Sequence, residues 1–236
     1  MIEYLLLIAG AVILASMVVT IMIGIPQISS GGSSQKAQTS ANEFNKYKTL
    51  GQVRGGYRFE GNLQDSSGSS YSVLVLPAVY SFSAGKIGSS ISLSSPYLQF
   101  PTQVINGLAD FTFMAWVKTR DNWVASIISS GPELNIYFTE LSGTLSVEGF
   151  AWDAPIQGNG AASADHWNHI AFTKNGTEVK IYLNCQPIET GTVSPNQSMG
   201  ASVTTMNISH STINFDETYI LNRALSQQEI KALAGC

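Results

Sequence analysis

Side chains able to do hydrolytic or metal chemistry are few and widely spaced along this 236-residue chain. Glu133, Glu140 and Glu148 are scattered, one at each strand edge, whereas a glycosidase needs two carboxyl groups that flank one sugar bond. His166 and His169 are three residues apart, a spacing compatible with a pair of metal ligands. No Gly-x-Ser-x-Gly string presents a nucleophilic serine. We therefore expect a protein that is not an enzyme.

An apolar segment opens the chain. Residues 1–25 include one charged residue, Glu3, and the next charge is Lys36. As a helix the segment would be about 37 Å long at roughly 1.5 Å per residue, and a bilayer core is about 30 Å thick. A secretory signal peptide would have a basic head, a shorter apolar stretch and a small-residue cleavage site, and none of these is present. A lone carboxylate near the end of such a helix needs a cation, and the nearest is the α-amino group of Met1 or of a neighbouring copy.

The string Met1-Ile2-Glu3-Tyr4 followed by LLLIAGAVILAS resembles the processed amino terminus of archaeal type IV pilin-like proteins, those with class III signal peptides. The resemblance implies that the helix first holds the subunit in the membrane and then packs with identical copies as the core of a filament. Met1 and Glu3 would be the assembly residues. In that family the glutamate usually lies a couple of residues further in, with Gln and Ser ahead of Glu-Tyr, so a preceding leader and its cleavage site stay open.

The composition is that of an exported surface protein. Only 12% of residues are charged, about half the usual share of around 25%. The net charge of −4 and the pI near 5.3 offer no basic field for nucleic acid. Three Asn-x-Ser/Thr sequons, at Asn175, Asn196 and Asn207, are candidate glycosylation sites. We expect an extracellular glycoprotein with a membrane-anchored precursor.

The organisation changes after Pro26, because proline disfavours helix continuation. A flexible Gly/Ser tether follows at residues 29–34, and Ala41–Lys48 could form a short helix with Phe44 and Tyr47 on one face. We therefore divide the chain into an apolar helix at 1–28, a tether with a short helix at 29–51 and a β-sandwich at 52–236.

The third segment consists of short β-rich runs broken by Gly, Asn, Ser and Pro. Its runs, with no amphipathic helix between them, predict one all-β sandwich or jelly roll. Ser226–Ala234 is the single late helix, with Ser226 as N-cap and Glu229 completing a capping box. The runs are Tyr71–Leu76, Ile91–Leu93, Tyr97–Phe100, Phe111–Val117, Ala125–Ser129, Leu134–Phe138, Leu145–Phe150, His169–Phe172, Val179–Leu183 and Tyr219–Leu221.

Four ordered landmarks in this segment resemble laminin G-like, concanavalin A-like domains. They are Tyr57–Asn62 with Asp65–Gly68; Phe111–Lys118; Trp167–Thr173 with Asn175-Gly176 and Val179–Leu183; and Phe215–Glu217 with Ala224–Ser226 and Glu229-Ile230. The resemblance implies a concanavalin A-like β-sandwich and a structural role for His169. It departs at Asn184-Cys185, where the family more often has Asp-Gly. Independently, Asn175-Gly176 predicts a two-residue type I′ hairpin turn.

The resemblance also implies a calcium ion near the first loop and the closing strand, held here by Glu60, Asp65 and Asp216. Calcium takes six to eight oxygen ligands, several of them carboxylate or backbone carbonyl. Glu60 stands where the family usually has Asp. The alternative is that Asp65 caps the turn that follows it, and that Asp216 and Glu217 are solvated charges at a strand end.

Flat aromatic rings that stack on the apolar face of a sugar are candidates for carbohydrate binding. Trp123 and Trp152 lie in polar, loop-like strings, Asp121-Asn122-Trp123 and Ala151-Trp152-Asp153. The alternative for both is an ordinary place in the core.

Cys185 and Cys236 are the only two cysteines, and an even pair in an extracellular compartment is more often bridged than free. We therefore predict a disulfide between them, which would hold the terminal helix to the sandwich. The alternative is two buried free thiols.

Two functions of different classes remain open. The first is a pilin: a structural subunit of a type IV pilus-like filament whose outer lectin-like domain mediates surface contact or adhesion. The second is a membrane-tethered, monomeric lectin-like binding protein. Glu3 and the lack of Lys or Arg before Lys36 favour assembly, because an ordinary anchor usually has basic residues on its cytoplasmic side. An archaellin-type subunit is a lesser alternative.

Overall fold

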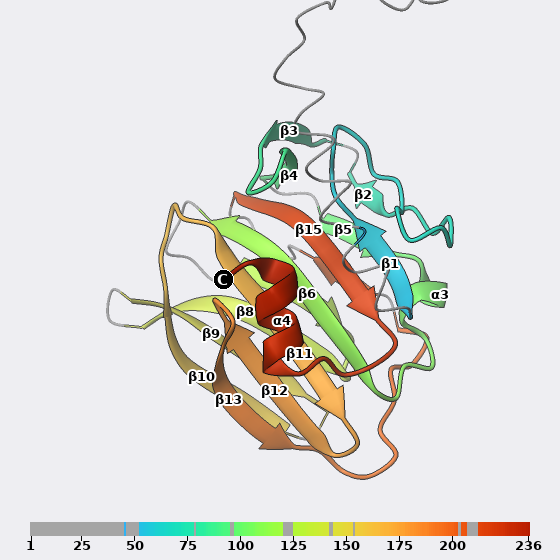
Figure 1. Cartoon of the computed structure of the whole chain (residues 1–236), viewed down its shortest axis with the longest axis vertical. Helices are drawn as coiled ribbons and strands as arrows, with labels where there is room; N and C mark the ends of the chain where they lie inside the picture. The colour runs from blue at the N-terminus through green and yellow to red at the C-terminus, as the bar shows by residue number, and fades with distance from the viewer. Residues whose placement is uncertain are drawn as a thin grey trace, which may run out of the picture. The chain divides into compact units, whose positions relative to one another are not determined.

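The computed structural model describes residue 45 and residues 52–77, 79–94, 97–119, 125–141, 144–152, 154–202, 204–206 and 212–236. Three predicted features lie outside the described residues: the apolar helix with Met1 and Glu3, the tether, and the short helix at Ala41–Lys48. Of that short helix, Asn45 alone is described. Within the described ranges, no helix is long and apolar enough to cross a membrane. From residue 52 onward the described chain forms a two-sheet β-sandwich with a short C-terminal helix (Figure 1).

The first sheet has eight antiparallel strands among the described residues. Strand β1 (Val53–Tyr57) pairs with β15 beside the main path. The order along that path is β13 (Gln186–Thr192), β12 (Glu178–Leu183), β11 (Asn168–Asn175), β6 (Phe111–Thr119), β15 (Ile213–Leu221), β4 (Ser89–Leu93) and β3 (Ser81–Ala84).

The second sheet has seven antiparallel strands in the part of the chain that is described. A one-turn helix, α3 (Thr102–Ile105), follows its strand β5. The order is β10 (Ala154–Ala162), β9 (Thr144–Ala151), β8 (Leu134–Leu141), β7 (Ala125–Ser130), β14 (Thr204–Met206), β5 (Tyr97–Phe100) and β2 (Leu74–Leu76).

Strand β6 shows how alternation builds the core. Phe111, Phe113 and Ala115 belong to the apolar cluster between the two sheets, whereas Met114 and Trp116 belong to a second cluster on the outer face of the eight-stranded sheet. This is the period of two expected of a strand with both faces buried. The predicted alternation of this segment is therefore confirmed.

Helix α4 (Gln227–Ala234) covers that outer face, lying over β6 and β11 in Figure 1. It begins with the predicted capping box of Ser226 and Glu229, and Gly235 ends it in the left-handed conformation at φ 72°. Ile230 and Leu233 are buried against the sheet, and full burial of one such side chain contributes roughly 1.5–3 kcal/mol. The helix is thus held by both its cap and its apolar face.

The predicted hairpin turn at Asn175-Gly176 is displaced by one residue. Asn175 still pairs with Glu178, so the central turn residues are Gly176 and Thr177, and of these Gly176 alone has a positive φ, 58°. That is the requirement of a type II′ turn, not of type I′. The next hairpin has the type I′ pattern, because Asn184 and Cys185 both have positive φ values, 48° and 64°.

Candidate functional site

Two acidic side chains converge on the β3–β4 turn from distant parts of the chain. Asp216, fully buried on β15, accepts a hydrogen bond from the Ile87 backbone N–H at 2.9 Å. Glu60, which follows β1, accepts one from the Ser89 N–H at 3.2 Å. A Cβ added at Gly85 would lie 2.6 Å from Asp216 Oδ2, and one at Gly88 would lie 1.9 Å from Glu60 Oε1. The two glycines therefore let the turn sit directly against both carboxylates.

This acidic pair has the properties of a cation site. Burial, followed by the charges of Glu217 and Glu60, raises the pKa of Asp216 to about 9. Glu60 Oε1 is buried and has no hydrogen-bond partner among the described residues. Glu217 is also buried, and its carboxylate accepts a hydrogen bond from the Tyr219 hydroxyl. Because a divalent cation would compensate this negative charge and complete the coordination of the Glu60 oxygen, Glu60 and Asp216 fit calcium.

Asp65, the third predicted calcium ligand, does not belong to this group. Its carboxylate accepts backbone N–H bonds from Gly56 at 3.0 Å, Ser67 at 2.8 Å and Tyr71 at 3.2 Å, and a hydroxyl bond from Ser67 at 2.7 Å. These bonds close its own loop, which was the alternative interpretation for Asp65. The alternative for Asp216 and Glu217, solvated strand-end charges, is wrong because both are buried.

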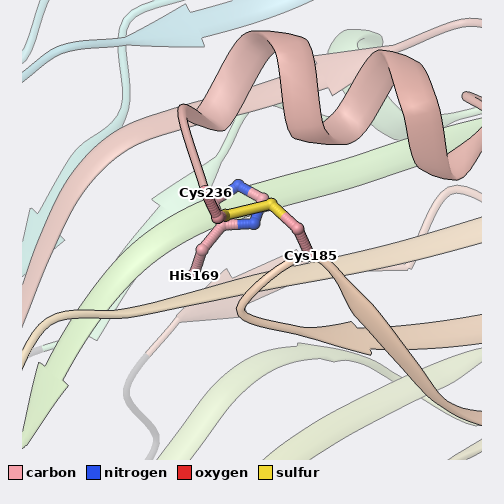
Figure 2. Close-up of side chains that lie close together, drawn as sticks. All are labelled: His169, Cys185 and Cys236. Atoms are coloured by element: carbon pink, nitrogen blue, oxygen red, sulfur yellow. A yellow bond between two sulfur atoms is a disulfide. The ribbon is translucent and has the colours of Figure 1, made fainter.

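The described residues contain one trio of His, Cys, Asp or Glu residues whose possible ligand atoms all lie within 4.8 Å of one another, and it is His169, Cys185 and Cys236 (Figure 2). The two cysteines form the predicted disulfide, with Cα atoms 6.0 Å apart. His169 is buried beside it, with its ring edge-on to Trp116 at a centroid distance of 5.2 Å. His166, by contrast, is exposed, and its ring nitrogen pairs with the Ala164 carbonyl oxygen at 2.9 Å.

The outward face of the seven-stranded sheet carries an aligned row with one residue from each strand. These residues alternate with core residues such as Leu98, Ile136 and Ala151, so they face away from the sandwich interior. Leu74 and Phe150, near the two ends, are 57% and 38% exposed, and the residues between them are polar and uncharged. In strand order the row is Leu74, Gln99, Thr205, Ser129, Asn135, Phe150 and Pro155.

A second aligned row on this face comprises Ser126, Tyr137 and Glu148. Glu148 alone is charged among the residues of the two rows. Thr205, near the middle of the first row, is 5% exposed, and its hydroxyl has no hydrogen-bond partner among the described residues. The face thus combines exposed apolar and aromatic groups with hydrogen-bonding groups, and α4 lies on the other sheet.

Of the two tryptophans expected to bind carbohydrate, Trp123 lies outside the described residues. Trp152, in the β9–β10 turn, is half-buried and packs against the core. Its ring centroid lies 5.5 Å from Nζ of Lys174, which donates to the carbonyl oxygens of Ala109 and Gly176 at 2.8 and 2.7 Å. Lys174 and Asp110 line an open cavity of about 570 Å³ next to the β11–β12 turn.

A laminin G family model described as the concanavalin A-like lectin/glucanases superfamily matches residues 93–231 of the chain. The chain belongs to this superfamily. A comparison with curated protein sequences finds no match.

Solved structures with the same fold include domain 4 of an extracellular arabinanase from Geobacillus stearothermophilus, in complex with arabinotriose. It is 17% identical with a TM-score of 0.65, and the alignment covers 78% of this chain and 98% of that domain. The binding domain of a Paraclostridial mosquitocidal protein is 16% identical at a TM-score of 0.61, over 77% and 51% of the two chains. The binding domain of botulinum neurotoxin DC, in complex with sialyl T, is 16% identical at a TM-score of 0.61, over 78% and 51%. The chain spans about half the length of these toxin domains.

The predicted glycosylation residues and Glu133 lie at different places in this concanavalin A-like domain. Asn175 and Asn196 are exposed, whereas Asn207 lies outside the described residues. Glu133, in the β7–β8 turn, accepts a hydrogen bond from the Ser202 hydroxyl at 3.0 Å. The outward row could not be predicted from the sequence, because its residues come from seven separate strands and only strand pairing aligns them.

Proposed function

We propose that this protein is an extracellular lectin-like binding protein that holds a carbohydrate on the outward face of its seven-stranded sheet. The observation that carries the proposal is the row from Leu74 to Pro155. Its end residues offer apolar surface to sugar C–H groups, and its amide and hydroxyl groups match sugar hydroxyls as donors and acceptors. Seven strands at roughly 4.8 Å spacing extend about 29 Å, enough for an oligosaccharide lying across them.

The similar structures support a carbohydrate ligand, because arabinotriose is present with the arabinanase domain and sialyl T with the neurotoxin domain. Their 16–17% identity carries the fold and no individual contact, so the binding residues must be argued from this chain. The scattered carboxylates Glu133, Glu140 and Glu148 support binding without hydrolysis, since glycoside hydrolysis uses an acid pair across one bond.

We also propose calcium as a structural ion held by Glu60 and Asp216. Bound calcium would supply positive charge to a buried acidic group and would link the β1–β2 segment, the β3–β4 turn and β15. Carbohydrate binding at the row does not require it, since the row belongs to the other sheet.

The apolar segment at 1–25 and the position of Glu3 support a second, compatible role as a pilin-like filament subunit. In this role identical subunits assemble through Met1 and Glu3 after a membrane-anchored stage, and the sandwich contacts other surfaces. A membrane-tethered monomer would carry the same binding face without assembly, and an archaellin-type subunit remains the lesser alternative.

The binding proposal is tested with the full chain, purified in detergent, on an immobilised panel of neutral and sialylated oligosaccharides. Phe150→Ala should reduce binding of any captured glycan about two- to twelvefold, since one stacking ring contributes about 0.5–1.5 kcal/mol. Tyr80→Ala is the matched control, because Tyr80 is 39% exposed, against 38% for Phe150, and lies outside the row. Equal loss in both variants, or no glycan captured by the unmodified protein, would contradict the proposed face.

A further inference from the structure

The disulfide corner holds a third potential ligand that the disulfide does not use. His169 is 1% exposed, and its Nδ1 has no hydrogen-bond partner among the described residues. A ring nitrogen and both sulfur atoms lie within 4.8 Å of one another, and Figure 2 shows the imidazole directly behind the sulfur–sulfur bond. Two sulfurs and one imidazole are ligands that zinc prefers.

The backbone around these residues is held without the disulfide. The Asn184 side chain accepts a hydrogen bond from the His169 N–H at 2.9 Å, and the Asn184 N–H donates to the His169 carbonyl oxygen at 2.7 Å. The Gln227 side chain donates to the Cys185 carbonyl oxygen at 3.0 Å. His169 and Cys185 are therefore kept close together by strand pairing, and the start of α4 is tied to the same turn.

Cys236 is kept near this corner by α4 itself. The helix buries Ile230, Leu233 and Ala234 and is capped at both ends, with Gly235 directly before Cys236. Opening the disulfide removes one covalent bond and leaves these contacts in place. Because ligands that need little reorganisation bind more tightly, the corner is suited to capture a metal ion after reduction.

We propose that reduction of the Cys185–Cys236 disulfide converts this corner into a zinc site formed by the two thiolates and the imidazole of His169. A dithiol reductant supplies two electrons and two protons, becomes a disulfide itself and leaves two protein thiols. Zinc then binds with release of the two thiol protons. Cys236 is exposed, so water can complete a tetrahedral shell as fourth ligand. Reoxidation by a disulfide oxidant, which accepts two electrons and two protons to become two thiols, restores the Cys185–Cys236 bond and releases the ion.

This corner is distinct in kind from the acidic pair Glu60 and Asp216. Thiolate and imidazole ligands favour zinc and other transition metals such as copper and iron. Carboxylate oxygens favour calcium.

The test uses the full chain in detergent. Saturating calcium is included to occupy the acidic pair Glu60 and Asp216, and cobalt(II) is the only other metal ion, added as the spectroscopic probe. After reduction, the protein should bind one cobalt ion with thiolate-to-metal charge-transfer absorption, and the oxidised protein should show no such absorption. His169→Gln should weaken cobalt binding at least about tenfold, because loss of even an outer-shell partner of a metal ligand typically costs about 10–100-fold in affinity. His166→Gln is the matched control, because His166 is exposed and three residues away, and it should bind as the unmodified protein does.

A measurement on the unmodified protein covers the case in which His169→Gln does not fold. X-ray absorption of the reduced zinc complex should show two sulfur atoms at about 2.3 Å and nitrogen or oxygen at about 2.0–2.1 Å. Absence of thiolate absorption in the reduced protein, or a zinc shell without sulfur, overturns the proposal. Unchanged cobalt affinity in a folded His169→Gln variant also overturns it.

Discussion

Ser226 and Glu229 hydrogen-bond to each other in both directions at the start of α4. The Ser226 backbone N–H donates to the Glu229 carboxylate at 2.8 Å, and the Glu229 N–H donates to the Ser226 hydroxyl at 3.3 Å. The same carboxylate pairs with Arg223 at 2.8 Å. One short segment thus sets both where the helix begins and how it is tied to the chain leaving β15.

Acid should weaken this arrangement. Arg223, followed by the Ser226 backbone, lowers the pKa of Glu229 to about 2. Because the folded pKa is below the unfolded one, this group's contribution to stability is present above about pH 4.5 and is lost as the pH falls through about 2. Glu229→Gln keeps a capping-box residue but not the charge, so it should cost less than about 1 kcal/mol at pH 7. Urea unfolding should show this difference disappearing near pH 2, and a difference that persists there would rule out the charge as its cause.

Calcium should raise the melting temperature of the full chain, because a ligand that binds only the folded state stabilises it. Asp216→Asn should abolish this rise. Asp65→Asn should lower the melting temperature with and without calcium, since Asp65 closes its own loop, and the calcium-dependent rise should survive. Thermal unfolding in EDTA and in calcium distinguishes the two variants. A calcium response lost in Asp65→Asn and kept in Asp216→Asn would reverse our assignment.

Removal of the disulfide by replacing Cys185 should destabilise the sandwich, by an amount that depends on the replacing residue. The cysteines are 51 residues apart, for which the chain-entropy model gives roughly 4 kcal/mol. Cys185 has a φ of 64°, a conformation that costs a side chain about 1 kcal/mol and glycine little. Cys185→Gly should therefore be more stable than Cys185→Ser in denaturant unfolding. Equal stability of the two would show that the turn imposes no such strain.

Glu3 should be needed for assembly and not for membrane insertion. We expect its carboxylate to pair with the α-amino group of an adjacent subunit, which offsets the burial of both charges. Glu3→Ala should leave the full chain in the membrane fraction and abolish filaments in electron micrographs of shed surface material. Normal filaments in this variant would contradict the assembly role. Filaments absent from the unmodified protein as well would favour the tethered monomer.

Sequence alone determined the features that depend on local pattern. Alternation over Phe111–Val117 predicted β6, and Ser226 with Glu229 predicted the start of α4. Two cysteines in one chain allow a single intramolecular pairing, which the structure contains. Each of these three predictions depends on a few neighbouring residues or on the number of cysteines, and each was confirmed.

Tertiary structure decided which residues from distant runs share a face. β10 and β13 were not predicted, because their sequences APIQGNGAA and QPIETGT lack an apolar alternation and pair only where neighbouring strands offer their edges. The calcium candidates separated for a similar reason, since hydrogen bonds within its own loop hold Asp65, whereas the β3–β4 turn joins Glu60 to Asp216. The outward row from Leu74 to Pro155 likewise follows from strand register. Part of this register comes from pairing between strands far apart in the chain, such as β2 with β5 and β7 with β14, which short sequence patterns do not reveal.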